Sequence, residues 1–324
     1  MDKRLKFGLY LIIFGLFALF VLLFRHPKQP TYTASEVLGA KSNLTLFIEP
    51  DDGRAPLLEL INNSQQIWGT IYLLSDPQII EALASKSAQL ILEEHPFGGN
   101  ILNRKTKTVL GDLVSWGNPA FDYTHEKALV FDDQLVCILN MNLTKTGFTT
   151  NREYNICSSD PQNILEVKNI FWADKNRTRY QANASDLIVS PDNSRAKLTA
   201  FLENSAKQID IAMEVISDEK IEALLCQKES NEVEVRLLIP DFKKVDNSTA
   251  SAKLANCGAE VKTLKKPYLH AKLIVVDGLR AYVGSVNLTA GSLDKNRELG
   301  ILVSQPDILG RLNEIFNRDW LAGS

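Results

Sequence analysis

Two stretches of the sequence decide its fold: HEKALVFD at residues 125–132 and HAKLIVVD at residues 270–277. Both have the pattern H-x-K-x4-D, and they begin 145 residues apart. Two shorter motifs recur at the same offset, namely NLT at 142–144 and 287–289, and NRE at 151–153 and 296–298. A match that keeps its spacing over this distance predicts two copies of one structural unit.

The repeat extends toward both ends of each copy. Downstream, a proline, a phenylalanine and an aspartate correspond pairwise: Pro161, Phe171 and Asp174 with Pro306, Phe316 and Asp319. Upstream, the pairs PD and RA within 50–55 match those within 191–196 at an offset of 141 residues. We therefore expect a first repeat over residues 41–182 and a second over residues 183–324.

Each repeat alternates short strand patterns with helix patterns, which predicts the α/β class. In the first repeat we expect strands at 44–48, 66–74 and 89–93 and helices at 55–64 and 77–87. In the second we expect strands at 186–189, 208–215 and 232–239 and helices at 194–206 and 218–227. The apolar runs 128–131 and 273–276 predict buried strands after each HxK triplet. This order predicts helices that cover a largely parallel sheet.

The N-terminus carries an unbroken apolar run, FGLYLIIFGLFALFVLLF, at residues 7–24. At 1.5 Å per residue such a helix is about 27 Å long, enough to cross a hydrocarbon core. No A-x-A-like site follows it, so we expect a transmembrane signal anchor rather than a cleaved signal peptide. The basic residues before the run place residues 1–6 in the cytoplasm. The prediction is a single-pass membrane protein with a tether at 25–40 and a periplasmic or extracellular catalytic domain.

Composition narrows the function only slightly. The 324 residues carry a net charge of −3, with a sequence pI of about 5.9, which gives no support for a broadly nucleic-acid-binding surface. A local basic cleft remains compatible with that balance. Cys137, Cys157, Cys226 and Cys257 form no CxxC pair, which argues against a zinc site. They are compatible either with disulfides in an exported domain or with buried free thiols.

The HxK pattern has a chemical meaning when it lies on a strand. Alternation sends His125 and Lys127 to one face, and the same holds for His270 and Lys272. A neutral imidazole is a nucleophile or a proton shuttle, and the lysine beside it supplies a positive charge for a phosphoryl oxygen. These four residues are the catalytic candidates. Asn142 and Asn287 add amide donors for the same oxygens, which makes them phosphate-binding candidates.

Two glutamates complete the candidate set. Glu153 and Glu298 each follow the histidine of their own repeat by 28 residues, and a carboxylate orients an imidazole and stabilises the imidazolium. Two such sets facing one phosphorus allow one histidine to attack while the other protonates the leaving oxygen. This chemistry needs neither a metal nor another cofactor, and no metal-binding pattern is apparent. Asp132 and Asp277 end a strand before a turn, so we expect them to be structural.

The second copy reads H-x-K-x4-D-x6-G-S-x-N from His270 to Asn287. It resembles the HKD signature of the phospholipase D superfamily, and the flanking YLHAK, VGSVNLT and NRELGI are similar to its bacterial phospholipase D-like and cardiolipin synthase-like members. The resemblance implies two αβαβα halves packed as a pseudo-dimer around one active site. It implies a two-step reaction through a phosphohistidine, with His125 as the nucleophile and His270 as the acid. Gly284 and Ser285 belong to the signature, the first structural and the second phosphate-binding.

The first copy departs from this signature at one point. Leu139 and Asn140 stand where glycine and serine are expected. Asn140 retains a hydrogen-bond donor, so we expect it to bind phosphate and the first copy to be active. A degenerate, inactive first copy is the alternative.

Three functions remain open. The first is hydrolysis or transfer of the phosphatidyl group of a phospholipid at a membrane, for which Trp116, Phe121 and Tyr123 offer an apolar lip or mere loop packing. The second is a nuclease, for which the basic cluster at 262–266 is either a phosphate track or a solvated face. The third is a non-catalytic phosphate-binding protein. Head group, second-step acceptor and oligomeric state are not determined by the sequence.

Overall fold

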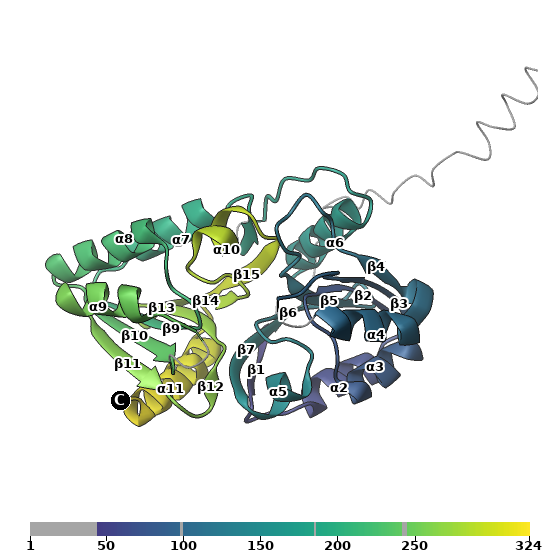
Figure 1. Ribbon diagram of the computed structural model, residues 1–324, viewed down its shortest axis with the longest axis horizontal. Helices are drawn as coiled ribbons and strands as arrows, with labels where there is room; N and C mark the ends of the chain where they lie inside the picture. The colour runs from purple at the N-terminus through teal and green to yellow at the C-terminus, as the bar shows by residue number, and fades with distance from the viewer. Residues whose placement is uncertain (1–43, 98–99, 185, 242–244) are drawn as a thin grey trace, which may run out of the picture. The chain divides into compact units, whose positions relative to one another are not determined.

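The computed structural model describes residues 44–97, 100–184, 186–241 and 245–324 (Figure 1). The two repeats appear there as a purple-to-teal half and a green-to-yellow half. The first contains β1 (Leu44–Glu49), α2 (Ala55–Asn63), β2 (Gln66–Ile71), α3 (Pro77–Ala84), β3 (Ser87–Leu92), α4 (Asn100–Leu110), β4 (Val114–Trp116), β5 (Lys127–Phe131), β6 (Leu135–Leu139), α5 (Lys145–Thr149), β7 (Asn151–Ser158) and α6 (Pro161–Lys175), with a 3₁₀ turn η2 (Gly111–Leu113).

The second repeat runs through the same kinds of element. It contains β8 (Leu187–Ser190), α7 (Ser194–Glu203), β9 (Gln208–Met213), α8 (Glu219–Ser230), β10 (Glu234–Pro240), α9 (Ser248–Asn256), β11 (Glu260–Leu264), β12 (Tyr268–Leu269), β13 (Lys272–Val276), β14 (Arg280–Gly284), α10 (Ala290–Asp294), β15 (Glu298–Val303) and α11 (Pro306–Ala322). The mixed α/β class and the tandem arrangement are confirmed.

Each repeat builds its own sheet with the same strand order. The first is β1-β7-β6-β5-β2-β3-β4, with β12 of the second repeat paired to β7, and the second is β8-β15-β14-β13-β9-β10-β11. The β2–β3 and β3–β4 ladders, their counterparts β9–β10 and β10–β11, and the β12–β7 ladder are parallel. The other ladders within each sheet are antiparallel, so the prediction of a largely parallel sheet was wrong.

Tight turns explain the antiparallel part. Asp132 and Asp133 have φ values of 48° and 59°, and Asp277 and Gly278 have 55° and 68°. They lie in three-residue turns, 132–134 and 277–279, which join the antiparallel neighbours β5 to β6 and β13 to β14. The carboxylate of Asp132 accepts from the backbone N–H groups of residues 65 and 66, and Asp277 accepts from those of residues 206–208. Both aspartates therefore tie a hairpin to the start of the neighbouring strand.

The apolar side chains form three clusters that alternate with the two sheets. One outer cluster joins α2, α3 and α4 to the first sheet, and another joins α7, α8 and α9 to the second (Figure 1). The middle cluster takes side chains from the inner faces of both sheets and from α6 and α11. Because the two repeats share this middle core, their facing edges are held together, and the functional candidates lie where the repeats meet.

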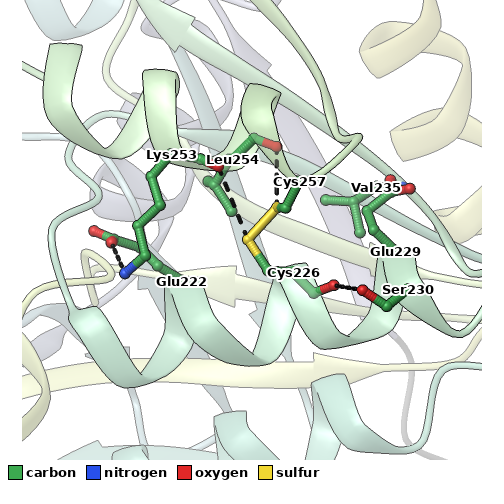
Figure 2. Close-up of a disulfide and its surroundings, with 8 residues drawn as sticks. All are labelled: Glu222, Cys226, Glu229, Ser230, Val235, Lys253, Leu254 and Cys257. Atoms are coloured by element: carbon green, nitrogen blue, oxygen red, sulfur yellow. Dashed lines mark hydrogen bonds and ion pairs between the residues drawn. A yellow bond between two sulfur atoms is a disulfide. The ribbon is translucent and has the colours of Figure 1, made fainter.

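Both pairs of cysteines form disulfides. Cys137 and Cys157 lie opposite each other on the neighbouring strands β6 and β7. Cys226 on α8 bonds to Cys257 at the end of α9, as Figure 2 shows, beside an ion pair between Lys253 and Glu222. Of the two alternatives left by the sequence, disulfides are therefore the one that the structure contains.

The predicted membrane topology requires a correction. In the described part of the chain no helix is long and apolar enough to span a membrane. The 17 residues of α11 bury one face against the core and expose charged side chains on the other, which is the pattern of a helix in a globular domain. The prediction of a single-pass membrane protein is therefore contradicted. The segments predicted as anchor and tether, 7–24 and 25–40, lie outside the described residues.

Candidate active site

Backbone pairing between the repeats places each candidate histidine. The N–H of His125 donates to the carbonyl of Arg297 at 2.8 Å, and the N–H of Arg297 donates to Tyr123 at 2.8 Å. In the second repeat, β12 pairs in parallel with β7, so that Leu269 lies beside Arg152. The segment before each histidine thus runs along the NRE motif of the opposite repeat.

This pairing crosses the histidines and the glutamates. His125 Nδ1 lies 2.6 Å from Glu298 Oε2, and His270 Nδ1 lies 2.7 Å from Glu153 Oε2. The sequence analysis associated each glutamate with the histidine of its own repeat, and the structure corrects that association. We call these two contacts the crossed His–Glu pairs. Both carboxylates are fully buried, whereas the histidine side chains keep 14% and 11% exposure, so a ligand can reach the rings.

The other residues of the NRE motif support this arrangement. Asn151 Nδ2 donates to Glu153 Oε1 at 3.0 Å, and Asn296 Nδ2 donates to Glu298 Oε1 at 3.1 Å. Each asparagine therefore holds the carboxylate oxygen that the histidine does not use. The sequence analysis did not assign these asparagines a role, although their recurrence in the motif was a signal for one.

The arginines of the same motif bind the two repeats to each other. Arg152 donates to both carboxylate oxygens of Asp319, at 2.6 and 3.1 Å, and Arg297 donates to Asp174 at 2.8 and 3.0 Å. All four side chains are buried. Asp174 and Asp319 are the aspartates that recur near the end of each repeat. Their constant offset of 145 residues therefore reflects two reciprocal ion pairs between the repeats.

The two lysines face the same centre. Lys127 Nζ lies 3.1 Å from His125 Nε2 and donates to the His125 carbonyl at 2.8 Å. Lys272 Nζ lies 3.5 Å from His270 Nε2 and donates to the His270 carbonyl at 2.7 Å. Both are fully buried, and the charges of Lys272 and Glu153 act on Lys127 across the interface. The two HxK pairs therefore form one composite site.

Burial determines the protonation of the first pair. Burial lowers the pKa of His125 to about 4, against the opposing effect of Glu298. Burial likewise lowers the pKa of Lys127 to about 7. Although burial acts to raise it, the pKa of Glu298 is lowered by the facing His125. At neutral pH His125 is therefore a neutral imidazole whose Nδ1–H donates to Glu298, which leaves the Nε2 lone pair for attack.

The two NLT asparagines lie beside the composite site. Asn287 Oδ1 accepts from the N–H of Val215 at 3.3 Å, so its contribution to a bound anion would come from its amide N–H groups. The Oδ1 atom of Asn142 is buried and has no hydrogen-bond partner. The predicted contact of both asparagines with a phosphoryl oxygen stays a prediction.

Ser285 and Asn140 occupy equivalent positions, and Ser285 also bonds to Glu298 of the first crossed His–Glu pair. Ser285 Oγ exchanges hydrogen bonds with the backbone of Leu299 at 3.1 and 3.2 Å. Asn140 Nδ2 donates to the carbonyl of Gly284 in the opposite repeat at 2.9 Å. Both side chains are fully buried. That these two side chains bind phosphate stays a prediction. Gly284 is structural, since a Cβ there would lie 2.4 Å from the Gly300 Cα.

Three of the apolar and basic residues considered as substrate contacts have other partners. Phe121 lies under the guanidinium of Arg297 at 4.2 Å, and the Trp116 ring lies under Lys107 at 5.3 Å. Lys262 Nζ lies 4.7 Å from the ring of Trp320. These contacts favour the packing interpretation for all three. Among the described residues, no group of three or more His, Cys, Asp and Glu side chains is arranged to hold a metal ion.

Comparison with known proteins gives a family match across both repeats. The family model described as "Cardiolipin synthase, PLD-like domain" matches residues 57–175 and 198–320. A cardiolipin synthase of Oceanobacillus iheyensis is 32% identical over 109 residues, which are 32% of this chain and 23% of that protein. The chain spans less than half the length of the curated relatives it matches.

Two solved structures share the fold. Phosphatidylserine synthase of Haemophilus influenzae Rd KW20 aligns with a TM-score of 0.63 and 12% identity, over 85% of each chain. Polyphosphate kinase of Porphyromonas gingivalis aligns with a TM-score of 0.66 and 15% identity, over 91% of this chain and 56% of that chain. At these identities the likeness concerns the fold alone.

Proposed function

This chain belongs to the phospholipase D-like family, and on that premise we propose that it hydrolyses or transfers the phosphatidyl group of phospholipids through a phosphohistidine intermediate. The observation that carries the proposal is the pair of crossed His–Glu contacts beside two buried lysines. Neither repeat alone holds a complete pair. The arrangement supplies a nucleophile, an acid and fixed positive charge around one phosphorus.

In the first step, His125 Nε2 attacks the phosphorus and forms an N–P bond. The bond from phosphorus to the head-group oxygen breaks, and His270 Nε2 donates its proton to that oxygen. Lys127 and Lys272 bind the nonbridging oxygens, where negative charge is held in the transition state. The products are the free head-group alcohol and a phosphatidyl group on His125.

In the second step, the now neutral His270 accepts a proton from water or from an alcohol. The activated oxygen attacks the phosphorus, the N–P bond breaks, and His125 is released as a neutral imidazole. Water yields phosphatidate, whereas an alcohol yields a new phosphodiester. A hydrolase and a synthase would thus follow the same two steps and differ only in the molecule that attacks the intermediate.

The family description supports a phospholipid as the substrate, because it names cardiolipin synthase. The net charge of −3 also fits a phospholipid better than a polyanionic nucleic acid. We therefore propose phospholipid, and treat nucleic acid as an outcome of the test.

A direct assay gives the purified chain, in EDTA, two sets of substrates. One set is phosphatidylglycerol, phosphatidylethanolamine and phosphatidylcholine in mixed micelles, with and without added glycerol. The other is single- and double-stranded DNA and RNA. We expect release of head group from lipid, and a new phosphodiester when glycerol is added if the chain is a transferase. Cleavage of nucleic acid alone would replace the proposal with a nuclease.

The chain offers a matched control for this assay. His125→Ala should abolish turnover, whereas His95→Ala should not, because the His95 side chain is 63% exposed and contacts only Glu94 in an ion pair of 3.9 Å. No activity on either set of substrates would favour a non-catalytic phosphate-binding protein.

A further inference from the structure

We infer that Glu214 is a positioning residue that keeps His270 protonated on Nε2, while Tyr72 at the equivalent place leaves His125 unprotonated for attack. The inference rests on the proposed function, because it explains why one histidine is the acid and the other the nucleophile. Neither residue belongs to a recurring motif. They mark a position at which the two repeats differ.

The sheet register establishes that the two positions are equivalent. Ile71 at the end of β2 pairs with Lys127, and Met213 at the end of β9 pairs with Lys272. The next residue in each strand direction is Tyr72 in one repeat and Glu214 in the other. Each follows the strand that neighbours the HxK strand, so each side chain lies beside its own histidine and lysine.

Glu214 binds the second HxK pair through both oxygens. Its Oε2 lies 2.7 Å from Lys272 Nζ and 3.4 Å from His270 Nε2, and its Oε1 accepts from the Tyr268 hydroxyl at 3.0 Å. Although burial acts to raise it, the pKa of Glu214 is lowered to about 2 by His270 and Lys272. An ionised carboxylate therefore faces His270 Nε2, in addition to Glu153 at Nδ1.

Tyr72 makes a different environment for the first HxK pair. Its ring lies 4.4 Å from the His125 ring, centroid to centroid, and Lys127 Nζ lies 5.1 Å above it. Its hydroxyl accepts from the N–H of Phe97 at 2.6 Å and does not reach the imidazole nitrogens. At His125 Nε2 the charged neighbour is the Lys127 ammonium, at 3.1 Å.

The charged and titratable groups around the two rings therefore differ in one place. His270 is faced by Glu153 of β7, Glu214 after β9 and Lys272 of β13, with Tyr268 of β12 bonded to Glu214. His125 is faced by Glu298 of β15, Lys127 of β5, Tyr72 after β2 and the charge of Lys272. Both rings have a lysine ammonium near Nε2, at 3.5 Å for His270 and 3.1 Å for His125. Only His270 also has a carboxylate facing Nε2 among the described residues, and this second carboxylate favours its imidazolium form.

The same geometry allows an opposite role, which the experiment must separate. A carboxylate bonded to Lys272 occupies a place that a phosphoryl oxygen would also use. If Glu214 acts mainly as a competitor of the substrate, its removal should raise phosphate affinity and turnover. If it holds the acid, its removal should slow expulsion of a poor leaving group.

The test compares Glu214→Gln with Glu219→Gln, which makes the same change at an exposed carboxylate in the first turn of α8. Two phosphodiesters are used: one with an alkyl leaving group, which needs a general acid, and one with p-nitrophenol, which does not. For Glu214→Gln we expect kcat on the alkyl substrate to fall about 10²-fold, the lower range for a lost general acid, and the p-nitrophenol burst to change by no more than about 3-fold. Glu219→Gln should retain both activities. Equal losses on both substrates, or a gain on either, would overturn the inference.

A second measurement separates this inference from the proposed function. Ring-nitrogen chemical shifts of His270, measured without substrate near neutral pH, report whether one or both nitrogens carry a proton. We expect two protons on the ring nitrogens of His270 in the unmodified chain and one in Glu214→Gln. The same number of protons in both would overturn the inference even in an active enzyme. The expected change would sustain it even if no phospholipid were turned over.

Discussion

At the scale of single residues, the site depends on contacts that cross between the repeats. His125 obtains its carboxylate from the second repeat, and His270 obtains its carboxylate from the first. Motif spacing identified all four residues, because each recurs at the same offset. It could not identify their partners, because motifs repeated at an offset of 145 residues fit equally well with a histidine–glutamate contact inside one repeat and with one between the repeats.

The crossed His–Glu pairs predict which variants behave alike. Glu298→Gln should reproduce the defect of His125→Ala, with loss of the covalent intermediate, while Glu153→Gln should reproduce that of His270→Ala. Each should lower kcat by about 10²–10⁴-fold, because an amide holds the imidazole in a different tautomer. Rapid-quench measurement of the intermediate distinguishes the two classes. If Glu298→Gln instead accumulates the intermediate as His270→Ala does, the crossed assignment is wrong.

Glu126, between His125 and Lys127, predicts a stability effect separate from catalysis. Both of its carboxyl oxygens are buried without a hydrogen-bond partner, and burial raises its pKa to about 8. A carboxyl whose pKa is raised on folding stabilises the fold below its ordinary pKa, and that stability is lost as pH rises toward 8. The glutamine of Glu126→Gln cannot ionise. The free energy of unfolding of this variant, relative to that of the unmodified chain, should therefore rise by on the order of 3 kcal/mol between pH 4 and pH 7.

Urea unfolding at the two pH values measures this difference. Glu59→Gln, on the exposed face of α2, serves as the control and should show little change. A pH-independent difference for Glu126→Gln would show that the carboxyl does not stay protonated in the fold.

At the scale of elements, the sequence predicted the first strands and helices of each repeat and the strand after each HxK triplet, but not how the strands pair. Alternating patterns placed β2 and β9 correctly, since period and turn residues are local signals. Strand direction depends on which strands become neighbours. The hairpins at Asp132 and Asp277 make the β5–β6 and β13–β14 ladders antiparallel, and the pairing of β12 with β7 joins residues from different repeats.

The buried ion pair between Arg152 and Asp319 should contribute strongly to the stability of the interface between the repeats. Arg152→Met leaves a buried carboxylate without its partner, and we expect a loss of about 3–5 kcal/mol in the free energy of unfolding. The matched control is Arg311→Met, because the Arg311–Glu314 pair lies on the surface and should contribute about 1 kcal/mol or less. Equal effects of the two variants in urea unfolding would contradict the proposed role of the buried pair.

At the scale of the whole molecule, we propose that the two repeats act as one enzyme with one site. The shared core, the reciprocal ion pairs and the crossed His–Glu pairs all require both halves. We therefore expect one covalent adduct per chain, although the chain contains two HxK motifs. The asymmetry between Tyr72 and Glu214 explains why two similar halves perform different steps.

The composite site also predicts a pH profile for kcat/KM, measured in the presence of EDTA. His125, with a pKa of about 4, must be neutral to attack, so activity should fall as pH drops through about 4. Lys127, with a pKa of about 7, must be charged to bind phosphate, so activity should also fall as pH rises above about 7. Activity that increases steadily to pH 9, or that requires a divalent metal, would contradict this account of the site.

The most direct test of the central claim locates the covalent intermediate. His270→Ala and His125→Ala variants are each mixed with bis(p-nitrophenyl) phosphate, whose leaving group needs no acid, then quenched in alkali and mapped by peptide mass spectrometry. We predict a phosphoryl adduct on His125 in the His270→Ala variant, at no more than one per chain, and none in His125→Ala. An adduct on His270 in the His125→Ala variant, or no adduct in either, would contradict the account.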